Sequence, residues 1–411
     1  MSIRPFNKKK DFPSVRRLWE EIAWIDRGDD DDAKFLEQFL SNSNNLVAEL
    51  NGEAECLVSS CPGSIRHLET DVSMTVIAAV TTSLIARKQG FASRTTARAI
   101  AEGAEAGMAT AVLGMFEQGY YSRLGFGNGA YAQIARFNPA SLNIEKKFEP
   151  PIRLTEKDYV DMHSALTRRW RGHGSVHIQP PQHLHADFGW TDEPVGLGYR
   201  SEDGELTHFF WGENKGEYGP LRISAMAYRN REQLLELLAL IKSMGNQLQL
   251  VRLTETEHMQ MQDLLEEPFR AQNKSEGGKY PELIRSEAWW QLRINDLPRC
   301  IAATHLPSRP TLSFNLSVDE PIGRYLDKQQ SWQGIGGDYT VHLGETSEAV
   351  SGHQAGLPLL KANTNGISRL WLGCASANRL ATSGEISAKQ DLLDQLDSTL
   401  KLPLPQPGWE F

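Results

Sequence analysis

Apolar residues alternate between strand-like and helix-like spacings along the first third of the chain. Segments 77–81 and 109–113 are short, largely apolar, β-prone runs, and an Ala-rich segment that ends near residue 105 lies between them. Segment 12–25 instead carries apolar residues at helical spacing, namely Val15, Leu18, Trp19 and Ile22. These patterns predict a helix over 12–25 and a strand–helix–strand unit over 77–113.

A tight turn is predicted where Asn51-Gly52 separates two β-prone runs, 46–50 and 54–58. Asn and Gly tolerate the positive φ angles of a two-residue hairpin turn, so the pattern predicts a β-hairpin. Further along, the order strand, helix, strand recurs over residues 221–253 without a basic glycine turn. This mixture of strands and helices predicts an α/β (α+β) fold built of layers.

The length of the chain, 411 residues, favours two or three domains. A proline-containing polar stretch near residue 150 and the dipeptide Leu297-Pro298 are typical of boundaries. We therefore predict domains over 1–145, 146–297 and 298–411. The last of these contains further strand-like apolar segments.

Composition argues against several classes of function. The formal net charge is -9 and the sequence pI is about 5.7, which argues against nucleic acid as the main partner. No apolar run approaches the roughly 20 residues of a membrane-spanning helix, so we expect no membrane partner. The four cysteines lack CxxC spacing and nearby histidines, so no metal site is expected. A reduced, cytoplasmic setting fits this cysteine usage.

A basic, glycine-containing turn joins the first strand of the 77–113 unit to its helix. Its sequence over residues 87–92 is Arg-Lys-Gln-Gly-Phe-Ala. Glycine permits close approach of a phosphate, and a helix start adds free N–H groups and partial positive charge. The turn therefore suits the diphosphate of an acyl-CoA, whose pantetheine can pair with the edge of the preceding strand. The alternative is an ordinary β–α turn with a solvated basic rim.

Tyr121 lies in a tyrosine- and glycine-rich segment, 119–127, that follows the second strand of the unit. Most tyrosines are half-buried with a hydrogen-bonded hydroxyl. The functional alternative is a general acid that protonates the thiolate leaving group of an acyl-CoA. The terminal carboxylate of Phe411 is a candidate proton acceptor, because burial would raise its low pKa. The alternative for Phe411 is a frayed chain end.

The strand, the basic turn and the segment 121–127 together resemble the GNAT acetyltransferases and, more narrowly, the enhanced intracellular survival (Eis) family of N-acetyltransferases. The resemblance covers essentially the whole chain. The predicted domain 146–297 resembles that family's degenerate GNAT-like domain. That domain ends in a sequence motif matched by Trp290, Arg293, Ile294 and Asp296. The predicted domain 298–411 resembles a sterol-carrier-protein fold at 312–318 and 370–373. The resemblance thus implies two GNAT-like domains with mixed twisted sheets and a sterol-carrier-protein-like C-terminal domain.

The same resemblance implies an enzyme that moves acetyl from acetyl-CoA to a small-molecule amine, aminoglycoside-like or another polyamine. It implies a hexamer, with Tyr121 as general acid and the carboxylate of Phe411 as general base. Trp24 and Asp26, the latter in an acidic run that otherwise reads as a solvated loop or helix start, are candidate contacts for the amine. The acetyl-CoA contacts that it implies are Val80, Thr81, Thr82, Arg87, Lys88, Gln89, Gly90, Phe91, Ala92, Ser93, Phe116 and Glu117.

Two positions depart from the family pattern. Phe116 stands where the family often carries a small hydroxyl residue, and Gln89 replaces an arginine of the most basic turns. Side-chain contacts to the cofactor are therefore expected to be fewer here, while backbone N–H groups remain. Two other functions stay open: an acyl-CoA-sensing lipid carrier without catalysis, and a protein lysine acetyltransferase.

Overall fold

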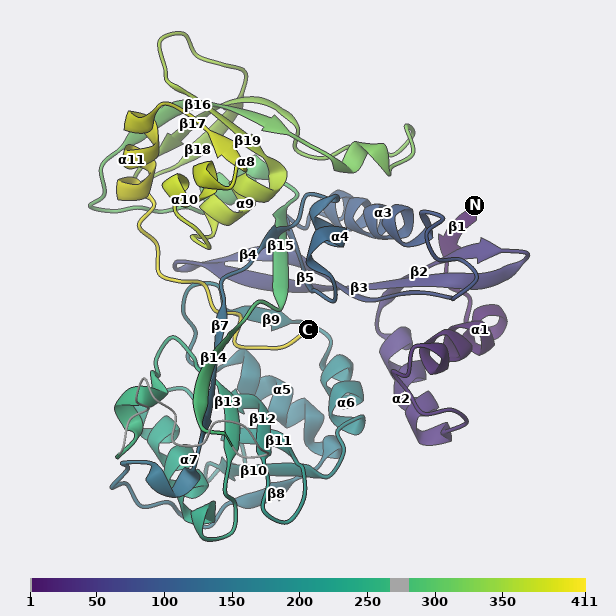
Figure 1. The fold of residues 1–411 in the computed structure, drawn as a ribbon, viewed down its shortest axis with the longest axis vertical. Coiled ribbons are helices and arrows are strands. Elements are labelled where there is room, and N and C mark those ends of the chain that lie inside the picture. Colours follow the sequence, from purple (N-terminus) through teal and green to yellow (C-terminus); the bar gives the residue numbers. More distant parts are fainter. Residues whose placement is uncertain (1, 267–280) are drawn as a thin grey trace.

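The computed structural model of the protein describes residues 2–266 and 281–411. In this part of the chain the strands form three mixed sheets of eight, seven and five strands (Figure 1). Mixed α/β architecture is thereby confirmed. Within the described residues, five short 3₁₀ helices join the elements: η1 (Pro139–Ser141), η2 (Glu156–Asp158), η3 (Met244–Asn246), η4 (Met261–Leu264) and η5 (Ile322–Arg324).

The first sheet has the order β1-β2-β3-β4-β5-β15-β6, with β9 beside β3. Its strands are β1 (Ser2–Pro5), β2 (Asn44–Leu50), β3 (Glu53–His67), β4 (Thr70–Thr82), β5 (Thr110–Gly114), β6 (Gly127–Asn128), β9 (Val176–Ile178) and β15 (Trp290–Ile294). The helices of this part are α1 (Lys8–Glu21), α2 (Asp30–Ser41), α3 (Phe91–Glu105) and α4 (Gln118–Ser122).

Local sequence signals account for much of this sheet. The predicted hairpin is confirmed, because Leu50 pairs with Glu53 and both turn residues, Asn51 and Gly52, have positive φ angles of 55° and 87°. The predicted helix 12–25 is α1, and it begins earlier, at Lys8, because the Asn7 side chain accepts a hydrogen bond from the Lys10 N–H.

The second sheet has the order β14-β7-β13-β12-β11-β10-β8. Its strands are β7 (Ala132–Phe137), β8 (Ile152–Leu154), β10 (Pro194–Arg200), β11 (Leu206–Asn214), β12 (Leu221–Ala227), β13 (Val251–Thr254) and β14 (Leu283–Glu287). Its helices are α5 (Tyr159–Thr167), α6 (Pro181–Gly189) and α7 (Arg231–Ser243). The unit β12-α7-β13 repeats β4-α3-β5, since each joins two parallel neighbouring strands through a helix. This confirms the predicted recurrence of strand, helix, strand.

The third sheet has the order β18-β17-β16-β19-β20. Its strands are β16 (Leu312–Asp319), β17 (Gly337–Leu343), β18 (Glu348–Ser351), β19 (Leu359–Asn363) and β20 (Ile386–Ser387). The helices of this part are α8 (Leu297–Ala302), α9 (Thr364–Trp371), α10 (Ala377–Thr382) and α11 (Gln390–Thr399). Whether this unit is related to sterol carrier proteins stays a prediction.

Two strands pair across the expected boundary at residue 145. Strand β7 joins β13 and β14 in the second sheet, and β15 returns to the first sheet between β5 and β6. One apolar core also runs between the sheets, from Ile65 in the first through Phe209 in the second to Leu316 in the third. The domain limits therefore stay predictions, while packing joins the sheets into one body. Within the described residues, no helix is long and apolar enough to cross a membrane.

Two buried histidines meet where segments of all three parts converge. The His67 Nε2 donates to the carbonyl of Trp371 (3.0 Å), and the His173 Nε2 donates to that of Leu372 (2.9 Å). The Nδ1 of His173 accepts from the N–H of Leu68 (2.9 Å), so His173 is neutral. Burial lowers the pKa of His67 to about 3 and also lowers that of His173.

We expect acid to destabilise the fold where His67 and His173 contact Trp371 and Leu372. A lowered folded-state pKa means that the unfolded chain, with an ordinary histidine pKa of about 6.5, binds more protons. The stabilisation is therefore present above about pH 6.5 and is lost as the pH falls toward the folded pKa, by about 1.4 kcal/mol per pH unit for each such group. Urea denaturation from pH 7 to pH 4 should show a smaller loss for His67→Phe than for wild type. His305→Phe, at an exposed site, is the control, and equal losses in all three proteins would contradict the expectation.

Candidate active site

A cavity of about 470 Å³ lies at the carboxyl ends of β4 and β5. The two strands are paired in parallel only as far as Ile77 and Leu113, and they separate beyond these residues. Nine of the residues expected from the sequence line the cavity: Trp24, Val80, Thr81, Thr82, Arg87, Ala92, Phe116, Glu117 and Tyr121. The separation of two parallel strands thus brings together residues from four segments of the chain.

The end of β4 offers backbone groups to this cavity. Leu57 pairs with Thr81 and Ser59 with Ala78, so Ala79 and Val80 together oppose a single residue of β3 in a β-bulge. On its other edge β4 has no strand beyond Ile77 in the described part of the chain, because β5 has turned away. Unpaired N–H and C=O groups on such an edge can hydrogen-bond an extended ligand.

The start of α3 lies at the same end of the sheet. Gly90, with φ of +82°, precedes the first helical residue, and no side chain caps the helix there. A Cβ at Gly90 would meet nothing within 4 Å, so the backbone is open to a close approach. Arg87, Lys88 and Gln89 are exposed around it. Free N–H groups, the helix dipole and two nearby cations suit a diphosphate.

The other expected residues have different surroundings. Phe91 is buried and packs with Cys56 and Ala86 beneath the turn, and the Ser93 Oγ donates to the hydroxyl of Tyr120 (3.3 Å). Asp26 is exposed and does not line the cavity. The acidic run begins α2, where the Asp29 side chain accepts from the N–H groups of Asp31 and Asp32, so its helix-start reading is confirmed.

Tyr121 lies on the short helix α4 with its ring 7% exposed. The ring packs edge-on against Tyr120, with centroids 4.8 Å apart. Tyr121 is one of the residues that line the cavity. Burial, with smaller contributions from Tyr120 and Glu117, raises the pKa of Tyr121. The phenol is therefore protonated at neutral pH and can donate a proton.

The C-terminal segment runs from the third part of the fold back between the other two (Figure 1). The carbonyl of Pro407 accepts from the N–H of Val176 (2.9 Å) and from Nη2 of Arg169 (3.0 Å). The Arg169 guanidinium also lies 5.7 Å from the centre of the Trp409 ring. This segment follows the gap between β12 and β13, where residues 405–410 and the two strands enclose a small cavity of about 70 Å³. The C-terminal segment thus packs on the second sheet at the place that corresponds to the open cavity of the first sheet.

The last residue reaches the first sheet. The Phe411 ring packs against Trp289, with centroids 5.0 Å apart. A Cβ built on Gly114 would lie 2.5 Å from a terminal oxygen of Phe411, so only glycine leaves room for the chain end there. Because Gly114 also lines the large cavity, the terminal carboxylate and Tyr121 belong to the same region. The chain end is packed rather than frayed.

Two carboxylates near the chain end were not found from the sequence. Burial, followed by the negative charge of Glu410, raises the pKa of Asp187 to about 7, and burial raises the pKa of Glu410 itself. Both residues are nevertheless exposed to solvent, within a part of the surface where protein atoms are densely packed. The position of Glu410 next to Phe411 was a usable signal, whereas Asp187 lies on α6 and no spacing relates it to the site.

Comparison with protein families identifies the part of the chain that holds the cavity. Residues 2–129 match the model of the acetyltransferase (GNAT) domain family. This segment is a GNAT acetyltransferase domain. The GNAT domain makes the protein an acyltransferase, and it contains the cavity, the basic turn and Tyr121. No curated protein matches the chain.

Solved structures share the fold over the whole chain. A conserved protein of unknown function from Enterococcus faecalis V583, described as a probable N-acyltransferase, is 15% identical with a TM-score of 0.80, covering 100% of this chain and 99% of its own. A GCN5-related N-acetyltransferase from Kribbella flavida is 17% identical with a TM-score of 0.76, covering 100% and 98%. Eis1 from Mycobacterium abscessus is 14% identical with a TM-score of 0.74, covering 100% of both chains. The GNAT domain is therefore one part of a larger fold that these proteins share.

Proposed function

We propose that the protein transfers acetyl from acetyl-CoA to an amine by direct attack of the amine on the thioester. The observation that carries the proposal is the cavity of the GNAT domain, which has the open edge of β4, the protonated phenol of Tyr121 and the chain terminus at Gly114 around it. No acyl-enzyme is required, because holding the two reactants together supplies much of the rate acceleration.

The cofactor groove follows from the backbone. The amides of the pantetheine arm would pair with the free edge of residues 80–82, and the diphosphate would lie on the N-terminal N–H groups of α3. Arg87 and Lys88 supply the counter-charge, while the neutral side chain of Gln89 donates to the carbonyl of Ile85 (2.8 Å). Phe116, which is 94% exposed at the cavity rim, offers an apolar face and no hydroxyl.

Proton transfers complete the reaction. The amine nitrogen bonds to the thioester carbon, the C–S bond breaks, and the sulfur takes the proton of the Tyr121 hydroxyl. The amine passes its own surplus proton to the carboxylate of Phe411. Asp187 and Glu410 place two further carboxyl groups near the chain end, which favours substrates with more than one amine, such as aminoglycoside-like compounds. The hexamer stays a prediction.

The proposal is tested by following CoA-thiol release with acetyl-CoA and a panel of mono- and polyamines, including aminoglycosides. Release that depends on the amine, with a product that is heavier by one acetyl group, is the expected result. If no amine supports release although calorimetry shows uptake of acetyl-CoA, transfer to a small amine is wrong, and the acyl-CoA-sensing carrier and the protein lysine acetyltransferase are the alternatives.

Replacing Tyr121 by Phe removes only the hydroxyl. We expect kcat to fall about 10²-fold, the lower range for loss of a general acid, while KM for acetyl-CoA changes little because the ring and the groove remain. Steady-state kinetics across pH provide the measurement. Turnover like that of wild type at every pH would exclude Tyr121 from the mechanism.

Displacing the chain end should also slow the reaction. A one-residue extension beyond Phe411, and Gly114→Ala, whose Cβ would overlap the terminal oxygen, are each expected to lower kcat by about 10-fold or more through loss of the base. Calorimetry should show unchanged binding of acetyl-CoA to the extended protein. Gly323→Ala is the matched control, since its Cβ would meet nothing closer than 3.9 Å. Full activity of the extended protein would contradict the role of Phe411.

A further inference from the structure

The turn that carries Tyr121 is held by its own backbone hydrogen bonds and by residues outside the GNAT domain. Helix α4 has only five residues, too few to be stable by itself. Inside the turn, the N–H of Leu124 donates to the carbonyl of Tyr121 (2.9 Å). Two more bonds lie inside the turn: the N–H of Gly125 donates to the carbonyl of Ser122 (3.2 Å), and the N–H of Phe126 donates to that of Tyr121 (3.4 Å). The carbonyl groups of Ser122, Leu124 and Phe126 also accept from side chains of β15 and α9.

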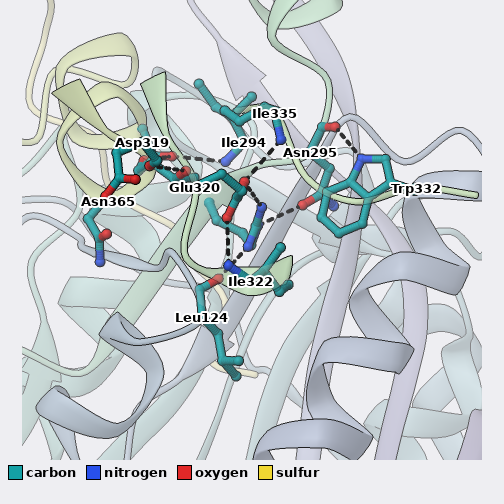
Figure 2. Close-up of polar contacts among 12 residues, drawn as sticks. Leu124, Ile294, Asn295, Asp319, Glu320, Ile322, Trp332, Ile335 and Asn365 are labelled. Carbon is teal, nitrogen blue, oxygen red and sulfur yellow. Dashed lines mark hydrogen bonds and ion pairs between the residues drawn. The ribbon is translucent and has the colours of Figure 1, made fainter. Parts of the chain in front are cut away.

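Arg293 on β15 provides the first support, and its partners Leu124, Asn295 and Glu320 are labelled in Figure 2. Its side chain is completely buried; one Nη donates to the carbonyl of Leu124, and the other lies 2.9 Å from Oε2 of Glu320. The Nε donates to Oδ1 of Asn295 (3.0 Å). Glu320 is itself fixed by the N–H groups of Ile322 (3.1 Å) and Ile335 (3.0 Å). The ion pair therefore connects the turn to the third sheet.

Asn365 on α9 provides the second support. Its Nδ2 donates to the carbonyls of Ser122 (2.9 Å) and Phe126 (2.5 Å), on either side of the Leu124 contact. The approach is close, because a Cβ at Gly127 would lie 2.5 Å from the carbonyl oxygen of Asn365. A Cβ at Gly125 would lie 2.9 Å from the Arg293 guanidinium, and this glycine also has φ of +84°. The turn thus packs closely against α9 and β15, which contact three alternate carbonyl groups, those of Ser122, Leu124 and Phe126.

We propose that Asn365, together with Arg293, is a positioning residue that aims the Tyr121 phenol into the cavity. The inference rests on the proposed function, because it assigns Asn365 an effect on proton transfer by Tyr121. Its physical basis is that a displacement of about 1 Å at a reacting group can cost about 10² in rate. The third part of the fold thereby takes part in catalysis without touching either substrate.

The test compares Asn365→Ala with a matched control, Asn378→Ala. The Nδ2 of Asn378 likewise donates two hydrogen bonds, to Asp394 (3.0 Å) and Asp397 (2.9 Å), but none to the turn. We expect Asn365→Ala to lower kcat about 10-fold or more with little change in KM for acetyl-CoA, and Asn378→Ala to leave both unchanged. If Asn365→Ala impairs folding, Asn365→Asp is the second variant. It keeps the size of the side chain but cannot donate a hydrogen bond, so we expect the same fall in kcat.

A double-mutant cycle separates positioning from general support. If Asn365 acts through Tyr121, Asn365→Ala should cause no further loss in the Tyr121→Phe background. Equal losses in both backgrounds, or wild-type kcat for Asn365→Ala, would overturn the inference. Amide exchange over residues 118–127 gives a readout independent of turnover, and it should accelerate in Asn365→Ala but not in Asn378→Ala. Failure of wild type to acetylate any amine would instead overturn the proposed function.

Discussion

The buried charge of Arg293 is the constraint on which the assembly of the fold depends. An unpaired guanidinium in the interior costs several kcal/mol, so its partners must be in place together. These partners are the carboxylate of Glu320, the side chain of Asn295 and the carbonyl of Leu124. They come from the third sheet, from the end of β15 and from the turn after α4. Figure 2 labels Leu124, Asn295 and Glu320, the partners that these three regions supply.

The same architectural unit is used in two ways. In the first sheet, the parallel strands β4 and β5 separate and leave an open cavity with a free strand edge. In the second sheet, β12 and β13 separate in the same manner, and residues 405–410 lie against them. The second unit thereby secures the segment that places Phe411 beside Gly114. Strands β7 and β15 exchange between the two sheets, which joins the two units.

Local features of the candidate site could be predicted from the sequence. The Asn51-Gly52 hairpin, the β4-α3-β5 unit and the glycine turn at the start of α3 each depend on residues close together in the chain. Their spacing and their φ preferences are sufficient to specify them. For the same reason Tyr121 was found, since it follows directly after the strand that borders the cavity. Asp26 was placed near the amine because of its charge, yet it is exposed at the approach to α2.

The sequence by itself determined the mixed α/β layers, the basic turn and the candidate tyrosine, because backbone propensity and short-range spacing control these features. Only the tertiary structure decided that β15 completes the first sheet, that Asp187 lies near Glu410, and that Asn365 holds the Tyr121 turn. The residues in each of these contacts are more than 150 positions apart in the chain. Such contacts are selected by packing and by the pairing of buried polar groups, which periodicity along a single segment does not encode.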